Sequence, residues 1–219
     1  MKRLIPLILL IAALTLPVSY ARAQQPAELA PADTQVYLHI TDFDAWFDRF
    51  TQGPSGQQAR EEMEQSPQWQ VLLALLEMDS ETFFATYFGG DVVIFSPTAE
   101  PDAGGIIFTQ VAPADAEHAR GRLFLEAAGD IGDAALYQTA DGGGYFAILP
   151  GWVGLCDAAQ LGDLRTVLEG LGENDRLAHD ARFKEWAGLL PSERGITVYL
   201  ANDANETHAL GVTAVGNGL

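Results

Sequence analysis

The chain has 219 residues, with 12 basic and 30 acidic side chains and a formal net charge of −18 at pH 7. This excess of acid repels phosphate groups, which argues against a nucleic-acid partner and disfavours an anionic membrane surface. It favours solubility and leaves a cation or a basic protein as the expected kind of partner. A genomic base bias and a saline habitat both explain such a composition.

The first 23 residues have the pattern of a secretory signal peptide. A basic start at residues 1–3 precedes an apolar run, Leu4–Val18, and the small residues Ala21 and Ala23 follow it. We therefore predict export to the periplasm or beyond, with cleavage between Ala23 and Gln24. The alternative is a membrane anchor, but the run is shorter than the ~20 apolar residues of a span. We expect no integral membrane span after cleavage.

The remaining chain is predicted to form a flexible lead-in over residues 24–34 and one domain over residues 35–219. Residues 35–41 alternate between apolar and polar side chains, which is typical of a half-buried strand. Asp42 then opens a helical layer that extends to Phe88. The next strand, residues 91–96, is apolar on both faces and is expected to be central.

The stretch Gly104–Leu171 organises the predicted domain. We expect a strand at residues 106–111, a helix over Pro113–Ala128, and a meander of strands at residues 134–139, 145–149 and 152–156. A second helix should run from Asp157 to Leu171. Pro150-Gly151 has the residue preference of a type II turn between two strands of the meander.

Further along, Asp180 is expected to cap a helix, followed by strands at residues 196–201 and 207–214. Together these patterns predict an α+β fold with a mostly antiparallel sheet of about eight strands and helices packed on one face. The order strand, helices, strands recurs loosely, which suggests two similar halves. The strand-like sequence at the C-terminus is consistent with a final strand, or with a truncated version of a longer protein.

The residue types that bind metals are scattered. No two of the four histidines are three or four positions apart, and no stretch has the full spacing of a calcium-binding loop. We therefore predict neither metal ligands nor a cofactor site. The residues considered were His39, His118, His179 and His208, the acids Asp42, Asp44 and Asp48, and the turn residues Asp203, Asn205 and Thr207.

Candidate nucleophiles are equally isolated. Cys156 is the only cysteine, cannot form an intramolecular disulfide, and is expected to be a buried apolar residue. No serine lies in a Gly-x-Ser-x-Gly motif, and Ser66 and Ser80 are expected as helix caps. Asp91, after two glycines at the start of an apolar strand, is the one acid whose convergence with a histidine or a second acid would favour catalysis. We predict no catalytic residue.

Three short motifs carry a resemblance to a known family. They are residues 29–34 (Leu-Ala-Pro-Ala-Asp-Thr), residues 88–91 (Phe-Gly-Gly-Asp) and residues 177–183 (Leu-Ala-His-Asp-Ala-Arg-Phe). With the signal peptide, they resemble exported bacterial proteins that contain a Planctomycetes-type domain of unknown function. The resemblance implies an exported α+β protein and transfers no catalytic residue.

The sequence thus favours an exported, acidic, non-enzymatic binding or structural protein of the bacterial cell envelope. Two alternatives stay open. One is an envelope hydrolase whose acids converge only in three dimensions. The other is a carrier of a small apolar ligand, which would need an apolar cavity of a few hundred Å³ between sheet and helices.

Overall fold

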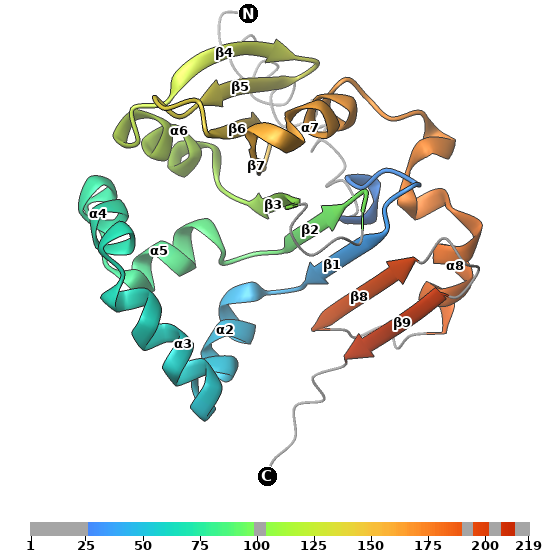
Figure 1. The fold of residues 1–219 in the computed structure, drawn as a ribbon, viewed down its shortest axis with the longest axis horizontal. Coiled ribbons are helices and arrows are strands. Elements are labelled where there is room, and N and C mark those ends of the chain that lie inside the picture. Colours follow the sequence, from blue (N-terminus) through green and yellow to red (C-terminus); the bar gives the residue numbers. More distant parts are fainter. Residues whose placement is uncertain (1–25, 99–103, 190–194, 202–206, 213–219) are drawn as a thin grey trace, which may run out of the picture.

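The computed structural model describes residues 26–98, 104–189, 195–201 and 207–212. Within these ranges, nine strands form one antiparallel sheet in the order β4-β5-β6-β7-β3-β2-β1-β8-β9 (Figure 1). The α+β class and the antiparallel sheet are therefore confirmed. The strands are β1 (Val36–Ile40), β2 (Val92–Ser96), β3 (Ile106–Gln110), β4 (Glu126–Ile131), β5 (Ala134–Gln138), β6 (Gly144–Leu149), β7 (Trp152–Asp157), β8 (Ile196–Ala201) and β9 (Thr207–Val212).

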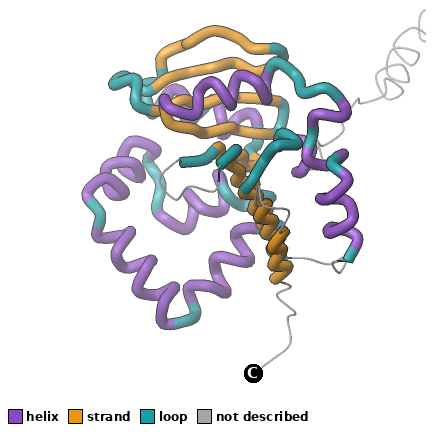
Figure 2. Tube along the Cα trace, turned by 45° about the vertical axis from the view of Figure 1, so that its right-hand side comes forward, coloured by secondary structure: helices purple, strands orange, loops and turns teal. Residues whose placement is uncertain are grey.

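Helix α6 lies between β3 and β4, helices α7 and α8 lie between β7 and β8, and the other described α-helices follow one another earlier in the chain. Helices α2 to α5 separate β1 from β2 and form an arm that projects from one side of the sheet (Figure 2). The α-helices are α2 (Phe43–Thr51), α3 (Pro54–Gln65), α4 (Pro67–Leu76), α5 (Ser80–Tyr87), α6 (Pro113–Arg122), α7 (Leu161–Leu168) and α8 (Ala181–Gly188), and the short 3₁₀ turns are η1 (Pro26–Glu28), η2 (Ala158–Gln160), η3 (Glu173–Asp175) and η4 (Leu177–His179).

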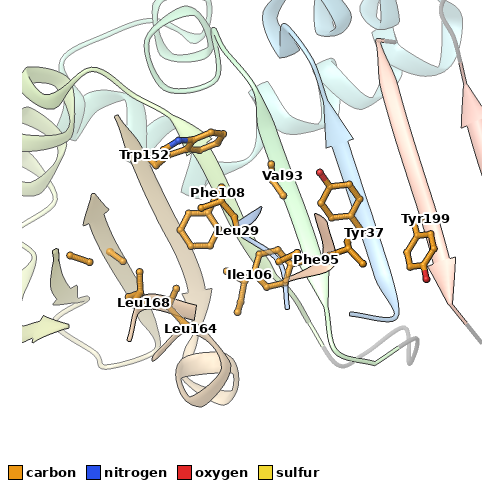
Figure 3. Close-up of a cluster of buried hydrophobic side chains, with 14 of the residues drawn as sticks. Leu29, Tyr37, Val93, Phe95, Ile106, Phe108, Trp152, Leu164, Leu168 and Tyr199 are labelled. Atoms are coloured by element: carbon orange, nitrogen blue, oxygen red, sulfur yellow. The ribbon is translucent and has the colours of Figure 1, made fainter. Parts of the chain in front are cut away.

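One face of the sheet carries the larger hydrophobic core. Ile106 and Phe108 of β3 are fully buried on this face, and they pack with Phe95 of β2 and Leu164 of α7 (Figure 3). Gly154 of β7 lies opposite Phe108, where an added Cβ would come within 2.8 Å of the phenyl ring. The glycine therefore makes room for an aromatic ring at the centre of the core.

The opposite face is also covered by helices. A second cluster joins Leu76 of α4 and Phe83 of α5 to Ala116 of α6, with Ile148 and Val153 of the sheet packed against it. The expectation that helices pack on one face is thus corrected, because helices contact both. The physical reason is that several strands are apolar on both sides, which requires cover above and below.

Residues 26–34 belong to the fold. Leu29 and Ala30 are buried in the larger core, the Leu177 N–H donates to the Ala30 carbonyl at 2.8 Å, and Pro31 forms a β-bridge with Arg176. The prediction of a flexible lead-in is wrong for these residues. The apolar side chains of Leu29 and Ala30 lie next to the sheet, and burying them there lowers the free energy relative to leaving them in water. The predicted signal peptide and its cleavage site lie outside the described residues.

Several predicted boundaries change. Helix α6 ends at Arg122 instead of Ala128, and residues 126–131 form the edge strand β4. The helix expected from Asp157 is shorter, because β7 includes Asp157 and α7 ends at Leu168. Ser66 precedes α4 without a side-chain capping bond and donates instead to Gln68.

Other local predictions are confirmed. The side chains of Asp42 and Asp180 accept the expected capping hydrogen bonds at the starts of α2 and α8. Helix α5 is capped by Asp79, and Ser80, the expected cap, is its first residue. The three-stranded meander is present, and Gly151 takes the positive φ of 79° that a type II turn needs at its third position.

Candidate functional site

The face covered by α4, α5 and α6 contains an apolar cavity of about 470 Å³. Its floor is built from alternate residues of three neighbouring strands, β3, β6 and β7. In the register of these strands, Ile107 lies opposite Leu155, and Ile148 lies opposite Val153, so all four point to the same face. Since side chains alternate along a strand, the same strands bury Phe108 and Trp152 on the other face.

Three helices form the roof. Leu72 and Leu76 of α4 face the cavity together with Phe83 and Tyr87 of α5. Helix α6 contributes only the small residues Ala116 and Ala119 at its centre, and this leaves space that larger side chains would fill. The remaining lining residues are Phe88, Gly105, Thr109, Val111, Arg120, Leu123, Leu125, Thr139, Gly144, Tyr145, Phe146, Cys156 and Asp157.

The two faces differ in how completely their side chains are covered. Ile106 and Phe108 are 0% exposed on the packed face, while their neighbour Ile107 is only partly buried on the cavity face. Val153, Leu155 and Ile148 are also only partly buried. Protein interiors are normally packed with few voids larger than a water molecule. A cavity of this size is therefore a feature of the fold and has the dimensions of a ligand pocket.

Polar atoms at the back of the cavity already have partners within the protein. The Thr109 hydroxyl donates to the Tyr87 carbonyl at 2.6 Å. The Tyr87 hydroxyl lies 3.4 Å from both the Asp115 carbonyl and the Nδ1 of His118. Burial raises the pKa of the Tyr87 phenol, and the Asp115 carboxylate adds to this. The back of the cavity therefore presents hydrocarbon and leaves few polar groups to recognise a ligand.

Charge appears at the edge. Arg120, in the last turn of α6, lines the cavity with a side chain that is 40% exposed. Its Nε donates to Glu117 at 2.7 Å, and its guanidinium carbon lies 5.6 Å from the centre of the Tyr137 ring. Asp157 also lines the cavity, but its Oδ1 accepts the backbone N–H groups of Ala159 and Gln160.

Cys156 belongs to the same strand as the floor residues. Burial, together with the carboxylates of Asp157 and Asp163, raises the pKa of its thiol to about 11. Reactive cysteines instead have a lowered pKa in a positive environment. Cys156 is only partly buried and lines the cavity, so it is less buried than the sequence predicted.

Asp91 does meet a histidine. The Nε2 of His39 lies 3.1 Å from Oδ2 of Asp91, and both side chains are partly buried. The hydrogen bond from His39 lowers the pKa of Asp91, and the nearby backbone N–H of Asp42 lowers it further. Burial acts in the opposite direction and raises this pKa. This is the contact that would favour catalysis, but neither residue lines the apolar cavity or the second cavity of the described structure.

The second cavity, of about 450 Å³, lies between the β6–β7 turn, η1 and the end of α7. It is more polar, and Arg176 is its one basic lining residue. The Arg176 guanidinium is occupied, because it donates to the carbonyls of Glu28 and Leu171. This arginine joins the N-terminal segment to the loop after α7, which is a structural role.

The other residues considered from the sequence do not converge. Within the described ranges, no group of three or more His, Cys, Asp or Glu side chains could hold a metal ion. Asp203 and Asn205 lie outside these ranges, as do the side chains of Thr207 and His208. Among the helices that are described, none is long and apolar enough to cross a bilayer.

Comparison with family models gives no match, and neither does comparison with curated proteins. Among solved structures, the chain is similar to one described as crystal form I of TP0453, with a TM-score of 0.44 and 11% sequence identity. The alignment covers 83% of this chain and 64% of that one, so the chain spans less than two thirds of the length of TP0453.

Proposed function

We propose that this protein is an exported binding protein of the bacterial cell envelope that holds a small apolar molecule in the cavity beneath α4, α5 and α6. The observation that carries the proposal is the cavity itself. Its volume of about 470 Å³ lies within the range of about 300–1,000 Å³ typical of small-molecule sites, and its lining is almost entirely apolar.

The role is one of binding and carriage. The polar groups at the back of the cavity are bonded within the protein, and the thiol of Cys156 has a raised pKa. The pair His39 and Asp91, which would suit a hydrolase, lies away from this cavity. Export fits this role, because an envelope carrier would shield an apolar molecule as it crosses water. The resemblance of the three short motifs to exported bacterial proteins supports the same setting.

A chain-length series tests the proposal. We expect the purified protein, without residues 1–23, to bind primary n-alkanols with an affinity that rises about fourfold for each added methylene, since each buried methylene contributes about 0.8 kcal/mol. The rise should stop when the chain exceeds the cavity. Calorimetric titration, or displacement of the neutral dye N-phenyl-1-naphthylamine, measures both the slope and the plateau.

A variant in which a larger side chain fills the cavity provides the matching test. Ala119→Phe places a phenyl ring in the space that Ala119 lines, and we expect it to abolish alkanol binding while the protein stays folded. Ala114→Phe, at an exposed position of the same helix, is the control and should bind as the wild type does. Equal binding by both variants, or no binding by the wild-type protein, would refute the proposal.

A further inference from the structure

The edge of the cavity indicates what kind of apolar molecule fits it. We propose that the ligand is a single-chain amphiphile with an anionic head, such as a long-chain carboxylate, whose chain occupies the cavity and whose head pairs with Arg120. This inference rests on the proposed function and adds the chemical class of the ligand.

The first step is the position of Arg120. Among the residues that the structure describes, it is the only basic one that lines the apolar cavity, and it stands where the helical roof formed by α6 ends. Its alkyl stem can lie along the apolar wall while the guanidinium stays at the solvent edge, which is the usual arrangement for a long cationic side chain. An amphiphile whose chain enters the cavity would place its head at the same edge.

The second step is the bonding capacity that Arg120 retains. Its Nε donates to Glu117, and, among the described residues, its Nη groups have no further hydrogen-bond partner. The ring of Tyr137 lies 5.6 Å from the guanidinium carbon and limits where the group can move. An arginine held in this way can still offer two parallel N–H groups to a carboxylate. Glu117 is 54% exposed, so losing its ion pair would cost little.

The third step is the sign of the charge on the ligand's head group. Within the described part of the chain, Asp157 is the one acid that lines the cavity, and a cationic head would pair with it. Its Oδ1 already accepts two backbone N–H groups at the start of η2. A cation at Asp157 would have to compete with the two backbone N–H groups that already bind this carboxylate. An anion at Arg120 can accept hydrogen bonds from the Nη groups of the guanidinium. An anionic head is therefore favoured despite the acidic charge of the whole chain.

Three probes of equal chain length separate the contributions of chain and head. We expect decanoate to bind the wild-type protein more tightly than decanol, and decylamine to bind most weakly, in isothermal titrations below the critical micelle concentrations. Arg120→Gln should weaken decanoate binding about tenfold, the low end for a charge-assisted hydrogen bond, and leave decanol binding unchanged within twofold. Arg120→Lys should restore part of the loss.

Arg122→Gln is the matched control. Arg122 lies in the same turn of α6 and is 40% exposed, as Arg120 is, but it pairs with Glu77 and does not line the cavity. It should leave all three affinities unchanged. Equal losses for decanoate and decanol in Arg120→Gln, or a preference for decylamine, would overturn the anionic class and leave the binding function intact. Failure of all three probes would overturn both.

Discussion

The hydrogen bonds of Asp91, which precedes β2, connect this residue to β1 and to β3. Its carboxylate accepts from Nε2 of His39 in β1, while the Asp91 N–H donates to the side chain of Gln110 in β3. Asp42 has a positive φ of 53°, an uncommon conformation for a residue other than glycine. The Phe43 N–H donates to the Gly90 carbonyl at 3.0 Å, so residues 90 and 91 hold both sides of this turn from β1 into α2.

Asp91→Asn tests this role. We expect the free energy of unfolding to fall by about 1–3 kcal/mol, the usual effect of losing a hydrogen bond to a charged group. Because the pKa of Asp91 is lowered in the folded protein, its contribution is present above pH ~4, the unfolded value. It is lost as the pH falls through the folded pKa.

Urea unfolding from pH 3 to pH 6 measures the difference between wild type and variant. The difference should be constant above pH 5 and shrink below pH 4. Asp48→Asn, at an exposed position of α2, is the control and should change stability little. A difference that persists unchanged at pH 3 would contradict the assignment.

At the scale of elements, the end of α6 departs from the usual rule. The Leu125 N–H donates to the Arg120 carbonyl, and the intervening Phe124 has a left-handed φ of 53°, so this is a Schellman-type stop. Glycine normally occupies that position, because a Cβ is strained there. Phe124 is 71% exposed and gains little from burial.

We therefore expect Phe124→Gly to be more stable than Phe124→Ala by about 1 kcal/mol, since only glycine relieves the left-handed strain. The preference should reverse within α6, where Ala114→Gly should cost about 1 kcal/mol. Thermal unfolding of the three variants measures both signs. Equal stability of the Gly and Ala variants at position 124 would show that no strain is stored at this turn.

The same turn explains what the sequence could and could not predict. The meander and its Pro150-Gly151 turn follow from local residue preferences, and so do the aspartate caps. The end of α6 was predicted too late because no glycine marks it. Strand β4 was missed because residues 126–131 (Glu-Ala-Ala-Gly-Asp-Ile) favour a strand only weakly and form one by pairing with β5.

Only part of the cavity's architecture could be predicted from the sequence. Strands β3 and β7 are apolar on both faces, and this indicates that helices cover both sides of the sheet. Only β2 is predicted from its sequence to be apolar on both faces, and this leads to the expectation that helices cover a single face of the sheet. Which side chains leave space unfilled depends on how α4, α5 and α6 settle on the strands, and no local pattern encodes that. The contact between His39 and Asp91, 52 positions apart, is likewise a product of strand register.

At the scale of the whole molecule, the segment before β1 is held against the loop after α7. Leu29 is 2% exposed and packs in the larger core, close to the bridge between Pro31 and Arg176. Two of the three motifs that resemble exported proteins thus meet here, because Ala30 and Leu177 are hydrogen bonded. The hydrogen bond therefore joins two segments of this chain that lie about 150 positions apart.

Leu29→Ala should therefore destabilise the entire fold, by about 2–5 kcal/mol, as expected for a buried leucine. Asp33→Ala, at an exposed position of the same segment, should have little effect. Denaturant unfolding followed by tryptophan fluorescence measures both. A Leu29→Ala variant as stable as the wild-type protein would show that this segment is dispensable.

The position of β1 has a consequence for how the protein reaches this structure. β1 lies between β2 and β8, so it pairs with residues about 55 positions away on one side and about 160 on the other. The β5–β6–β7 meander, in contrast, closes between neighbours in the chain. Contacts between distant residues form more slowly, because a long loop must be closed before they are made. During synthesis β1 is the first of the described strands to emerge, and the edge that pairs with β8 stays open until β8 is made.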